Sequence, residues 1–541
     1  MKKIFLFIFF YLLSFGGAGG GFSFGGVGGG CQPASDLKRD FSWNMGYGGF
    51  IDSALYYQRG ITNMNFNTTI PIISARADSA GFWYSSSSIC DSLGRLQFYT
   101  NGIFIYGADG HTLAGNDTLN VGAYSQIHFD WGYPTIQATL ILPAPNESNK
   151  YYVFHQRLNN DIYPVPVELF YTTVDMSLNN GQGGVTSLRN LIISGDSLTR
   201  GKLTACRHAN GRDWWITQWH HGMHKGRKIL LDQIGVHDYG WLPALVPRFP
   251  RSATGQCVFS PDGSKFATIT NQVTVRNSKE LIRGHIEVYD FNRCTGEYSN
   301  PKFAILEDTA HLQTLGLSIS PNSRYLYTSY WTYDLNVPML THQYDLWAND
   351  IASTQTVVGV YDGFYDPDFA CCGNTSPNLH ALAPDGRIYI SGGISTRYFN
   401  IIQNPDIGGV GCNLQQHCLY FPTFNAGTVD NHPNFRLGVL AGSICDTIVS
   451  TINLNTHKIQ MELFPNPAIN NTRLVWYEPF KNNAKIEIIN SIGQIIETIK
   501  VQNSTTYQDI DIKNLPNGIY FVKLSTAEKQ NYTTKLIKIS E

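Results

Sequence analysis

A short turn-and-strand pattern recurs in the middle of the chain. It reads FSPDGSKFATIT at 259–270, ISPNSRYLYTSY at 319–330 and LAPDGRIYISGG at 382–393. Proline fixes its own φ angle, and Asp-Gly or Asn-Ser tolerates the backbone of a tight turn. The residues that follow alternate with a period of two, as a half-buried strand requires. Each copy therefore predicts a turn that leads into a β-strand.

The spacing of the copies predicts the architecture. Weaker copies extend the series toward the N-terminus, and one reference residue per turn gives successive intervals of 54, 63, 52, 60 and 63 residues. A repeat of this length, built from short strands, fits one four-stranded blade of a β-propeller. The six reference residues are Gly94, Ser148, Gly211, Gly263, Ser323 and Gly386.

The two flanking segments, 36–84 and 395–450, lie outside these six units. Together they are long enough for one more blade that is shared between the two ends and closes the ring. We therefore predict an all-β chain with a seven-bladed β-propeller over 36–450, and six blades are the alternative. A β-solenoid would need a shorter repeat and more uniform coils.

The N-terminus has the pattern of a secretory signal. Two lysines precede twelve residues, Ile4 to Phe15, that are apolar except for Ser14. This run is shorter than the roughly 20 residues that span a bilayer, but it suits the apolar core of a signal peptide. We predict a signal peptide at 1–18, a flexible glycine-rich segment at 19–35, and no transmembrane helix in the mature chain.

The composition agrees with an exported β protein and excludes two classes of partner. Charged residues make up 15% of the chain, whereas about 25% is usual for soluble proteins. With 39 basic and 41 acidic residues, no overall field favours nucleic acid or an anionic membrane. We expect neither as a partner.

Ten cysteines in an exported chain make disulfides plausible, because compartments beyond the inner membrane are oxidising. Cys412 and Cys418 close a short loop and are the predicted pair. Cys90, Cys206 and Cys257 stand four to six residues before three of the turns. These equivalent positions predict packed thiols on inner strands.

Few residues suggest chemistry. The chain has no H-E-x-x-H, P-loop or G-x-S-x-G motif, which favours a binding protein over an enzyme. His220 and His224 would chelate a metal if their loop folds into a turn, but we expect an exposed polar loop. Asp362, Asp366 and Asp368 could hold calcium, yet their spacing is not that of an EF-hand, so we expect solvated loop acids and no cofactor.

The composition changes after Cys445. Glycines become rarer, lysines appear, and alternating strands recur between turns at 465–467, 491–493 and 516–518. This pattern predicts a small Ig-like β-sandwich at 461–541 after a linker at 451–460.

The sandwich resembles the type IX secretion C-terminal sorting domain of Bacteroidetes. The resemblance rests on FPNPA at 464–468, IEIINSIGQII at 486–496, LPNGIYFVKL at 515–524 and KLIKIS at 535–540. It implies passage through the periplasm and recognition by the outer-membrane machinery, which releases the cargo or fixes it to the cell surface. The motif residues are Pro465, Asn466, Pro467, Gly493, Gly518, Tyr520, Lys535 and Lys538.

The larger part of the chain also resembles Bacteroidetes propellers with WD-like repeats, through segments such as CVFSPDGSKFA and NHPNFRLGVLAGSICDT. That resemblance implies a fold and a location rather than an activity. We therefore expect a secreted or surface propeller that binds an extracellular glycan or protein. The alternative is an extracellular enzyme, such as a polysaccharide lyase or hydrolase, with its site at the central channel.

Overall fold

The computed structural model describes residues 36–48, 60–76, 80–161, 164–245, 252–276, 279–306, 312–332, 337–368, 373–393, 395–445, 461–476, 484–491, 493–501, 505–526 and 531–540. The predicted signal peptide, the glycine-rich segment and the linker at 451–460 lie outside these residues. The chain divides into two compact units, Met1–Ile448 and Val449–Glu541. No helix among the described residues is long and apolar enough to cross a membrane.

The described residues of the first unit form seven antiparallel sheets, each made of consecutive strands. Sheet 1 holds β1 (Ser42–Tyr47), β2 (Gly60–Asn65) and β3 (Ile72–Arg76), and sheet 2 holds β4 (Ser87–Cys90), β5 (Leu96–Thr100) and β6 (Ile105–Gly107). Sheet 3 holds β7 (Thr139–Pro143), β8 (Lys150–Leu158), β9 (Pro166–Asp175) and β10 (Gly184–Ser194). Sheet 4 holds β11 (Thr204–Arg207), β12 (Trp214–Trp219), β13 (Gly226–Leu231) and β14 (Val236–Trp241).

The other three sheets repeat this order. Sheet 5 holds β15 (Ser252–Ala253), β16 (Cys257–Phe259), β17 (Lys265–Arg276), β18 (Lys279–Asn292) and β19 (Glu297–Leu306). Sheet 6 holds β20 (Leu312–Ile319), β21 (Tyr325–Thr332), β22 (Leu340–Asp345) and β23 (Thr356–Val360), and sheet 7 holds β24 (His380–Leu382), β25 (Ile388–Ser391), β26 (Thr396–Ile402) and β27 (Leu414–Asn425). Loops carry α1 (Ala123–Ile127), η2 (Asn179–Gly181), η3 (Ala352–Thr354) and η4 (Gly409–Cys412).

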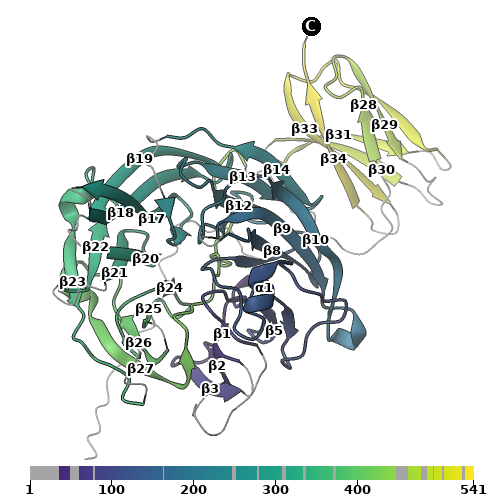
Figure 1. Cartoon of the computed structure of the whole chain (residues 1–541). Helices are drawn as coiled ribbons and strands as arrows, with labels where there is room; N and C mark the ends of the chain where they lie inside the picture. The colour runs from purple at the N-terminus through teal and green to yellow at the C-terminus, as the bar shows by residue number, and fades with distance from the viewer. Residues whose placement is uncertain are drawn as a thin grey trace, which may run out of the picture. The chain divides into compact units, whose positions relative to one another are not determined.

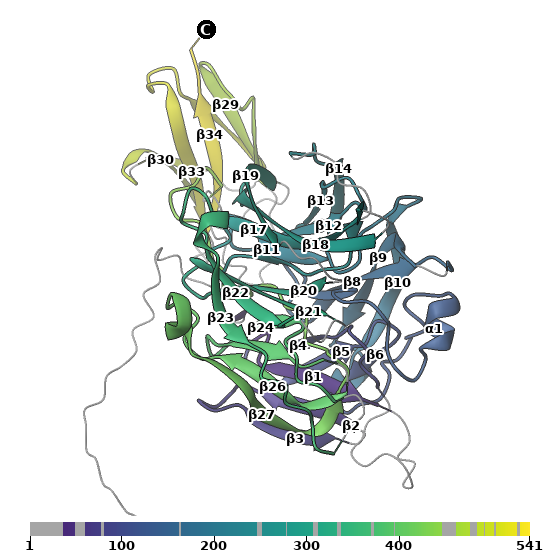
Figure 2. The same cartoon turned by 60° about the vertical axis from the view of Figure 1, so that its left-hand side comes forward.

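The sheets are arranged around a common centre, as in a propeller (Figures 1 and 2). The inner strand β4 contacts β1 and β7, and β16 contacts β11 and β20. The core lies between neighbouring sheets. One cluster joins Ile89, Leu140 and Trp214 of sheets 2, 3 and 4. Full burial of such side chains stabilises the fold by about 1.5–3 kcal/mol each, so packing between sheets holds the ring together.

The repeat seen in the sequence corresponds to one sheet. All six reference residues lie in the turn between the inner strand and the next strand of sheets 2 to 7, and in sheet 5 these strands are β16 and β17. Gly263, Ser323 and Gly386 have φ angles of 71°, 60° and 80°, in the left-handed region that this turn requires. Asp262 and Asn322 each accept a hydrogen bond from the backbone N–H two residues further on, at 2.9 and 3.0 Å. This local bond explains why Asp or Asn recurs there.

The ring does not close as predicted. All three strands of sheet 1 come from the N-terminal end, and β26 and β27 complete sheet 7 instead of a shared blade. The prediction of a shared blade is therefore wrong, because residues 395–425 supply the outer strands that follow the turn at Gly386. The next described residues, 426–445, contain no strand. We call them the crossing segment.

The second unit consists of two sheets with a common core. One sheet has the order β28 (Met461–Phe464), β29 (Asn471–Trp476), β32 (Tyr507–Asp511). The other has the order β31 (Ile495–Val501), β30 (Ala484–Asn490), β33 (Gly518–Thr526), β34 (Asn531–Lys538). Trp476 of the first sheet and Ile486 and Leu524 of the second are fully buried in the same cluster. This pattern follows from the alternation of apolar residues along each strand.

Candidate functional site

The crossing segment binds the inner strands of several sheets. Asn431 donates its side-chain N–H groups to the carbonyl oxygens of Thr139 and Leu203, at 2.8 and 3.0 Å. Asp430 accepts hydrogen bonds from Ser88 Oγ at 2.6 Å and from the backbone N–H of Asn44 at 3.3 Å. Two adjacent side chains thus connect sheets 1, 2, 3 and 4. These bonds replace the shared strand in joining the two ends of the ring.

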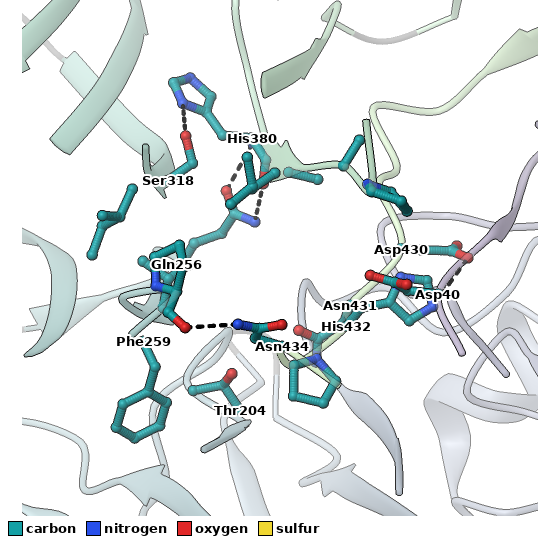
Figure 3. A pocket seen from close by; sticks show the side chains of 18 of the residues that line it. Asp40, Thr204, Gln256, Phe259, Ser318, His380, Asp430, Asn431, His432 and Asn434 are labelled. Atoms are coloured by element: carbon teal, nitrogen blue, oxygen red, sulfur yellow. Dashed lines mark hydrogen bonds and ion pairs between the residues drawn. The ribbon is translucent and has the colours of Figure 1, made fainter. Parts of the chain in front are cut away.

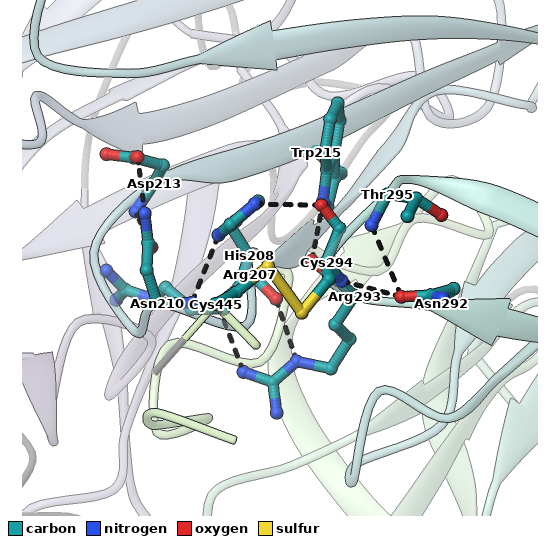
Figure 4. The surroundings of a disulfide bond; sticks show 10 residues. All are labelled: Arg207, His208, Asn210, Asp213, Trp215, Asn292, Arg293, Cys294, Thr295 and Cys445. Carbon is teal, nitrogen blue, oxygen red and sulfur yellow. Dashed lines mark hydrogen bonds between the residues drawn. A yellow bond between two sulfur atoms is a disulfide. The ribbon is translucent and has the colours of Figure 1, made fainter. Parts of the chain in front are cut away.

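The far end of the crossing segment is fixed by charge and by a disulfide. Arg436 pairs with both carboxylate oxygens of Asp40 at 2.6 and 2.8 Å. Cys445 is bonded to Cys294, which follows β18, with a Cα–Cα distance of 5.7 Å. Figure 4 shows Arg293 beside this bond, where its Nε donates to the carbonyl oxygen of Arg207 at 2.9 Å. The segment is therefore anchored on sheet 5 as well.

A cavity of about 440 Å³ lies between the crossing segment and the inner strands. Figure 3 shows Gln256, Phe259 and His380 grouped around it together with residues of the crossing segment. It lies at the end of the ring where the repeat turns gather, because Pro261, Pro321, Pro384 and Gly386 line it. The walls are mainly apolar, formed by Phe41, Trp43, Ala205, Val258, Phe259, Leu317, Ile319, Ala381, Leu382 and Ala383.

Two glutamines fill the centre of the ring next to this cavity. Gln137 accepts from the N–H of Cys257 and donates to the carbonyl oxygen of the same residue, both at 2.9 Å. Gln256 accepts from the N–H groups of Leu317 and His380, at 3.0 and 2.9 Å, and donates to His380 O at 3.0 Å. Each carboxamide therefore reaches inner strands of other sheets. The two carboxamides thus form a polar layer that links the inner strands beside the cavity.

A buried lysine completes this layer. Lys202 donates its ammonium group to the carbonyl oxygen of Gln256 at 3.3 Å and also bonds Thr268 and Ile269. Burial lowers the pKa of Lys202 to about 8. Its bonds go to neutral oxygen atoms, so it joins sheets 4 and 5 as a structural group.

A serine, a histidine and an aspartate meet at the cavity wall, but their geometry is not that of a nucleophilic triad. His432 Nε2 lies 2.9 Å from Ser88 O and 3.1 Å from Ser88 Oγ. Ser88 has no exposed surface, and its hydroxyl donates to Asp430. Burial raises the pKa of Asp430. Since a substrate cannot reach the Ser88 oxygen, these residues hold the crossing segment in place.

The two candidate histidines of this loop contact different partners. His220 is partly exposed, and its Nδ1 lies 2.7 Å from the carbonyl oxygen of His221. His224 is buried, with Nδ1 at 2.5 Å from Glu287 Oε1. The prediction of an exposed loop is therefore wrong for His224, because the loop folds back onto β18. Among the described residues, no cluster of three His, Cys, Asp or Glu side chains could hold a metal ion.

The three predicted aspartates contact arginine or histidine side chains. Asp366 and Arg397 form a fully buried ion pair at 2.9 Å, and Arg397 also contacts Asp368. Burial opposes ionisation of Asp366, but the hydrogen bonds from Arg397 outweigh it and lower the Asp366 pKa. Asp362 lies 3.0 Å from His417 Nε2. Solvated loop acids are thus a correct description only of the exposed Asp362 and Asp368.

The disulfide prediction is wrong. Cys412 is a buried free thiol in η4, and Cys418 is a free thiol on β27. The disulfide joins Cys294 and Cys445, which are 151 residues apart in the chain. A prediction based on short loops does not find a pair with this separation. The three thiols predicted on inner strands, Cys90, Cys206 and Cys257, are buried and free as expected.

The sorting motifs meet at one edge of the second unit. Asn466 accepts from the N–H of Ile537 at 2.9 Å and donates to Lys535 O at 2.6 Å. Asn517 donates to Ser540 Oγ at 3.0 Å, and Tyr520 donates to Pro516 O at 2.9 Å. The Pro-Asn-Pro opening thus binds the terminal strand. Of the other predicted motif residues, Gly493 has a φ of 85° in the turn from β30 to β31, Gly518 begins β33, and Lys538 ends β34.

The second unit matches a known protein family. Residues 462–539 match the family described as the secretion system C-terminal sorting domain. A search of curated proteins gives no match.

Among solved structures, a putative 6-phosphogluconolactonase from Bacteroides fragilis shares 10% identity at a TM-score of 0.31, over 72% of this chain and 98% of that one. A quinoprotein alcohol dehydrogenase-like protein from Bacteroides thetaiotaomicron shares 12% identity at a TM-score of 0.29, over 84% of this chain and 85% of that one. A putative TolB from Agrobacterium tumefaciens shares 14% identity at a TM-score of 0.29, over 56% of this chain and 87% of that one. These likenesses carry no conclusion about activity. The C-terminal unit, in contrast, is a type IX sorting domain, and the chain that carries it is a secreted or cell-surface protein.

Proposed function

We propose that residues 36–450 form a seven-bladed β-propeller that binds a ligand in its central cavity outside the cell. Seven sheets of consecutive strands around one centre support this blade number. The observation that carries the binding function is the cavity itself. Its volume of about 440 Å³ lies in the range of small-molecule sites, about 300–1,000 Å³, and inner strands of five sheets contribute to its wall.

The side chains of the cavity favour binding over hydrolysis. Asp40 is neutralised by Arg436, and Asp430 is held by Ser88 and the backbone of Asn44. Neither carboxylate is available as a general acid or base. Most of the residues that line the cavity are apolar, so the burial of apolar ligand surface against them is the main gain that binding offers. We therefore propose a mainly apolar ligand.

Narrowing the cavity tests this function. Ala381 lines the cavity, and Ala381→Phe should occupy part of the space that the ligand needs. The matched control is Ala352→Phe, at an exposed alanine of η3. A panel of small apolar molecules, peptides and polysaccharides is assayed for retention, for turnover and for the rise in melting temperature that accompanies binding.

We expect at least one molecule to stabilise the wild type and the control but not Ala381→Phe. Equal binding to Ala381→Phe would contradict the assignment to this cavity. Turnover of a polysaccharide that Ala381→Phe abolishes would instead support the enzyme alternative.

We further propose that the sandwich at 461–541 serves export alone, through the type IX machinery at the outer membrane. The separation of the chain into two compact units supports this division. A chain that lacks 461–541, expressed in a host with type IX secretion, should remain folded and accumulate in the periplasm, whereas the intact chain reaches the surface or the medium. Equal amounts of both chains outside the cell, measured by fractionation, would exclude this role.

A further inference from the structure

The inner strands expose one backbone edge toward the centre of the ring. In an antiparallel pair, alternate residues bond the partner strand, and those between them point their N–H and C=O groups the other way. Gln256 and Ser260 bond the neighbouring strand β17. Ile269 N donates to Gln256 O at 3.1 Å, and Ser260 N donates to Lys265 O at 2.9 Å. Cys257 and Phe259 therefore face away from β17, toward the centre.

The same alternation holds in the next two sheets. Ser320 N donates to Tyr325 O at 2.8 Å, and Ala383 N donates to Arg387 O at 2.9 Å. Leu317 and Ile319 of β20 therefore present their backbone groups to the centre. His380 and Leu382 of β24 do so as well. Each of these three inner strands thus offers two central positions, which lie two residues apart.

Carboxamide groups bind five of the six central backbone groups of the first layer. The layer consists of Cys257, Leu317 and His380, and the side chains of Gln137 and Gln256 bind it through five hydrogen bonds. An amide suits this position because it carries a donor and an acceptor on one planar group. It therefore pairs with a strand edge as another backbone would.

The second layer has the same backbone groups but no carboxamide. It consists of Phe259, Ile319 and Leu382, and all three line the cavity. Within the described part of the chain, no side chain or loop bonds their central N–H and C=O groups. Backbone N–H and C=O groups need hydrogen-bond partners, and these three residues line the cavity, so a bound molecule is a natural partner for this layer.

We infer that the cavity binds a neutral, mainly apolar molecule through a carboxamide or peptide group. This inference rests on the binding function proposed above. The amide would pair with the edges at Phe259, Ile319 and Leu382, and the apolar part of the ligand would pack against Phe41. A charged ligand does not fit, because Asp40 and Arg436 neutralise each other at the cavity wall.

A series of related probes tests the inference on the intact wild-type protein. Benzamide has both amide functions, N,N-dimethylbenzamide lacks the donor, and ethylbenzene lacks both. Calorimetric titration should give a Kd for benzamide at least tenfold lower than for either relative, and Ala381→Phe should abolish the binding. Equal affinities would overturn the amide inference while the cavity function stands. If no probe and no member of the earlier panel binds, both proposals fail.

A pair of variants tests the role of the backbone directly. Leu382→Pro removes an N–H that takes no part in the pairing of β24 with β25, whereas Leu382→Ala keeps it. β24 is an edge strand of sheet 7, and proline is tolerated on an edge strand where its missing N–H would face away from the partner. Benzamide should bind the proline variant at least tenfold more weakly than the alanine variant, and equal binding would overturn the inference. If the proline variant does not fold, as judged by its melting curve, the probe series decides.

Discussion

His155 should make the protein sensitive to mild acid. Its side chain is fully buried in β8, with Nδ1 at 2.8 Å from Asn120 Oδ1 and Nε2 at 3.0 Å from Thr172 Oγ1. Burial, with a smaller contribution from the charge of Arg189, lowers the pKa of His155 to about 3. The folded protein therefore keeps this ring neutral at pH values where the unfolded chain protonates it.

The sign and the size of the effect follow from proton linkage. Below a pH of about 6.5 the unfolded chain binds one more proton at this position than the folded protein, so the free energy of unfolding falls as the pH falls. The loss continues until the pH reaches the folded-state pKa of about 3. One pKa unit corresponds to about 1.4 kcal/mol, so the loss from this residue at pH 5 is about 2 kcal/mol.

The assay is urea unfolding of the wild type and of His155→Gln at pH 7 and pH 5. His155→Gln removes the titrating group but keeps a polar side chain. From pH 7 to pH 5 the free energy of unfolding of the wild type should fall by about 2 kcal/mol more than that of His155→Gln. His111→Gln is the control, since the His111 side chain is 87% exposed, and it should follow the wild type. If His155→Gln also runs parallel to the wild type, the buried neutral histidine is not the cause of acid sensitivity.

Two further predictions concern the histidine loop and the disulfide. His224→Ala should lower the free energy of unfolding by about 3–5 kcal/mol, because it leaves the buried Glu287 without this partner. His220→Ala should change the free energy of unfolding by less than about 0.5 kcal/mol. Equal urea midpoints for the two variants would contradict the buried pair. Replacing Cys294 and Cys445 by serine should cost about 2–5 kcal/mol, because the bond closes a long loop in the unfolded chain. Unchanged thermal stability, or two free thiols detected by alkylation of the unreduced wild type, would contradict the disulfide.

The sequence alone determined the features that depend on neighbouring residues. The turn at Gly263 is predictable because the Asp262 side chain and the backbone that it bonds lie only two residues apart. Strand alternation is equally local, so the spacing of the turns was sufficient to predict repeated sheets around a centre. The Pro-Asn-Pro opening and the terminal strand of the second unit were recognisable in the same way, as short motifs in a set order.

Only the tertiary structure decided how the ring closes and where a ligand can bind. Asp430 and Ser88 are 342 residues apart in the chain, and no local pattern indicates which distant strand the crossing segment will meet. His224 looked like a loop residue because its partner Glu287 lies 63 positions away. The unpaired edge at Phe259, Ile319 and Leu382 arises only when three sheets turn the same side of their inner strands toward one centre. Local preferences determine each strand and turn, but contacts between distant residues determine what fills the space between them.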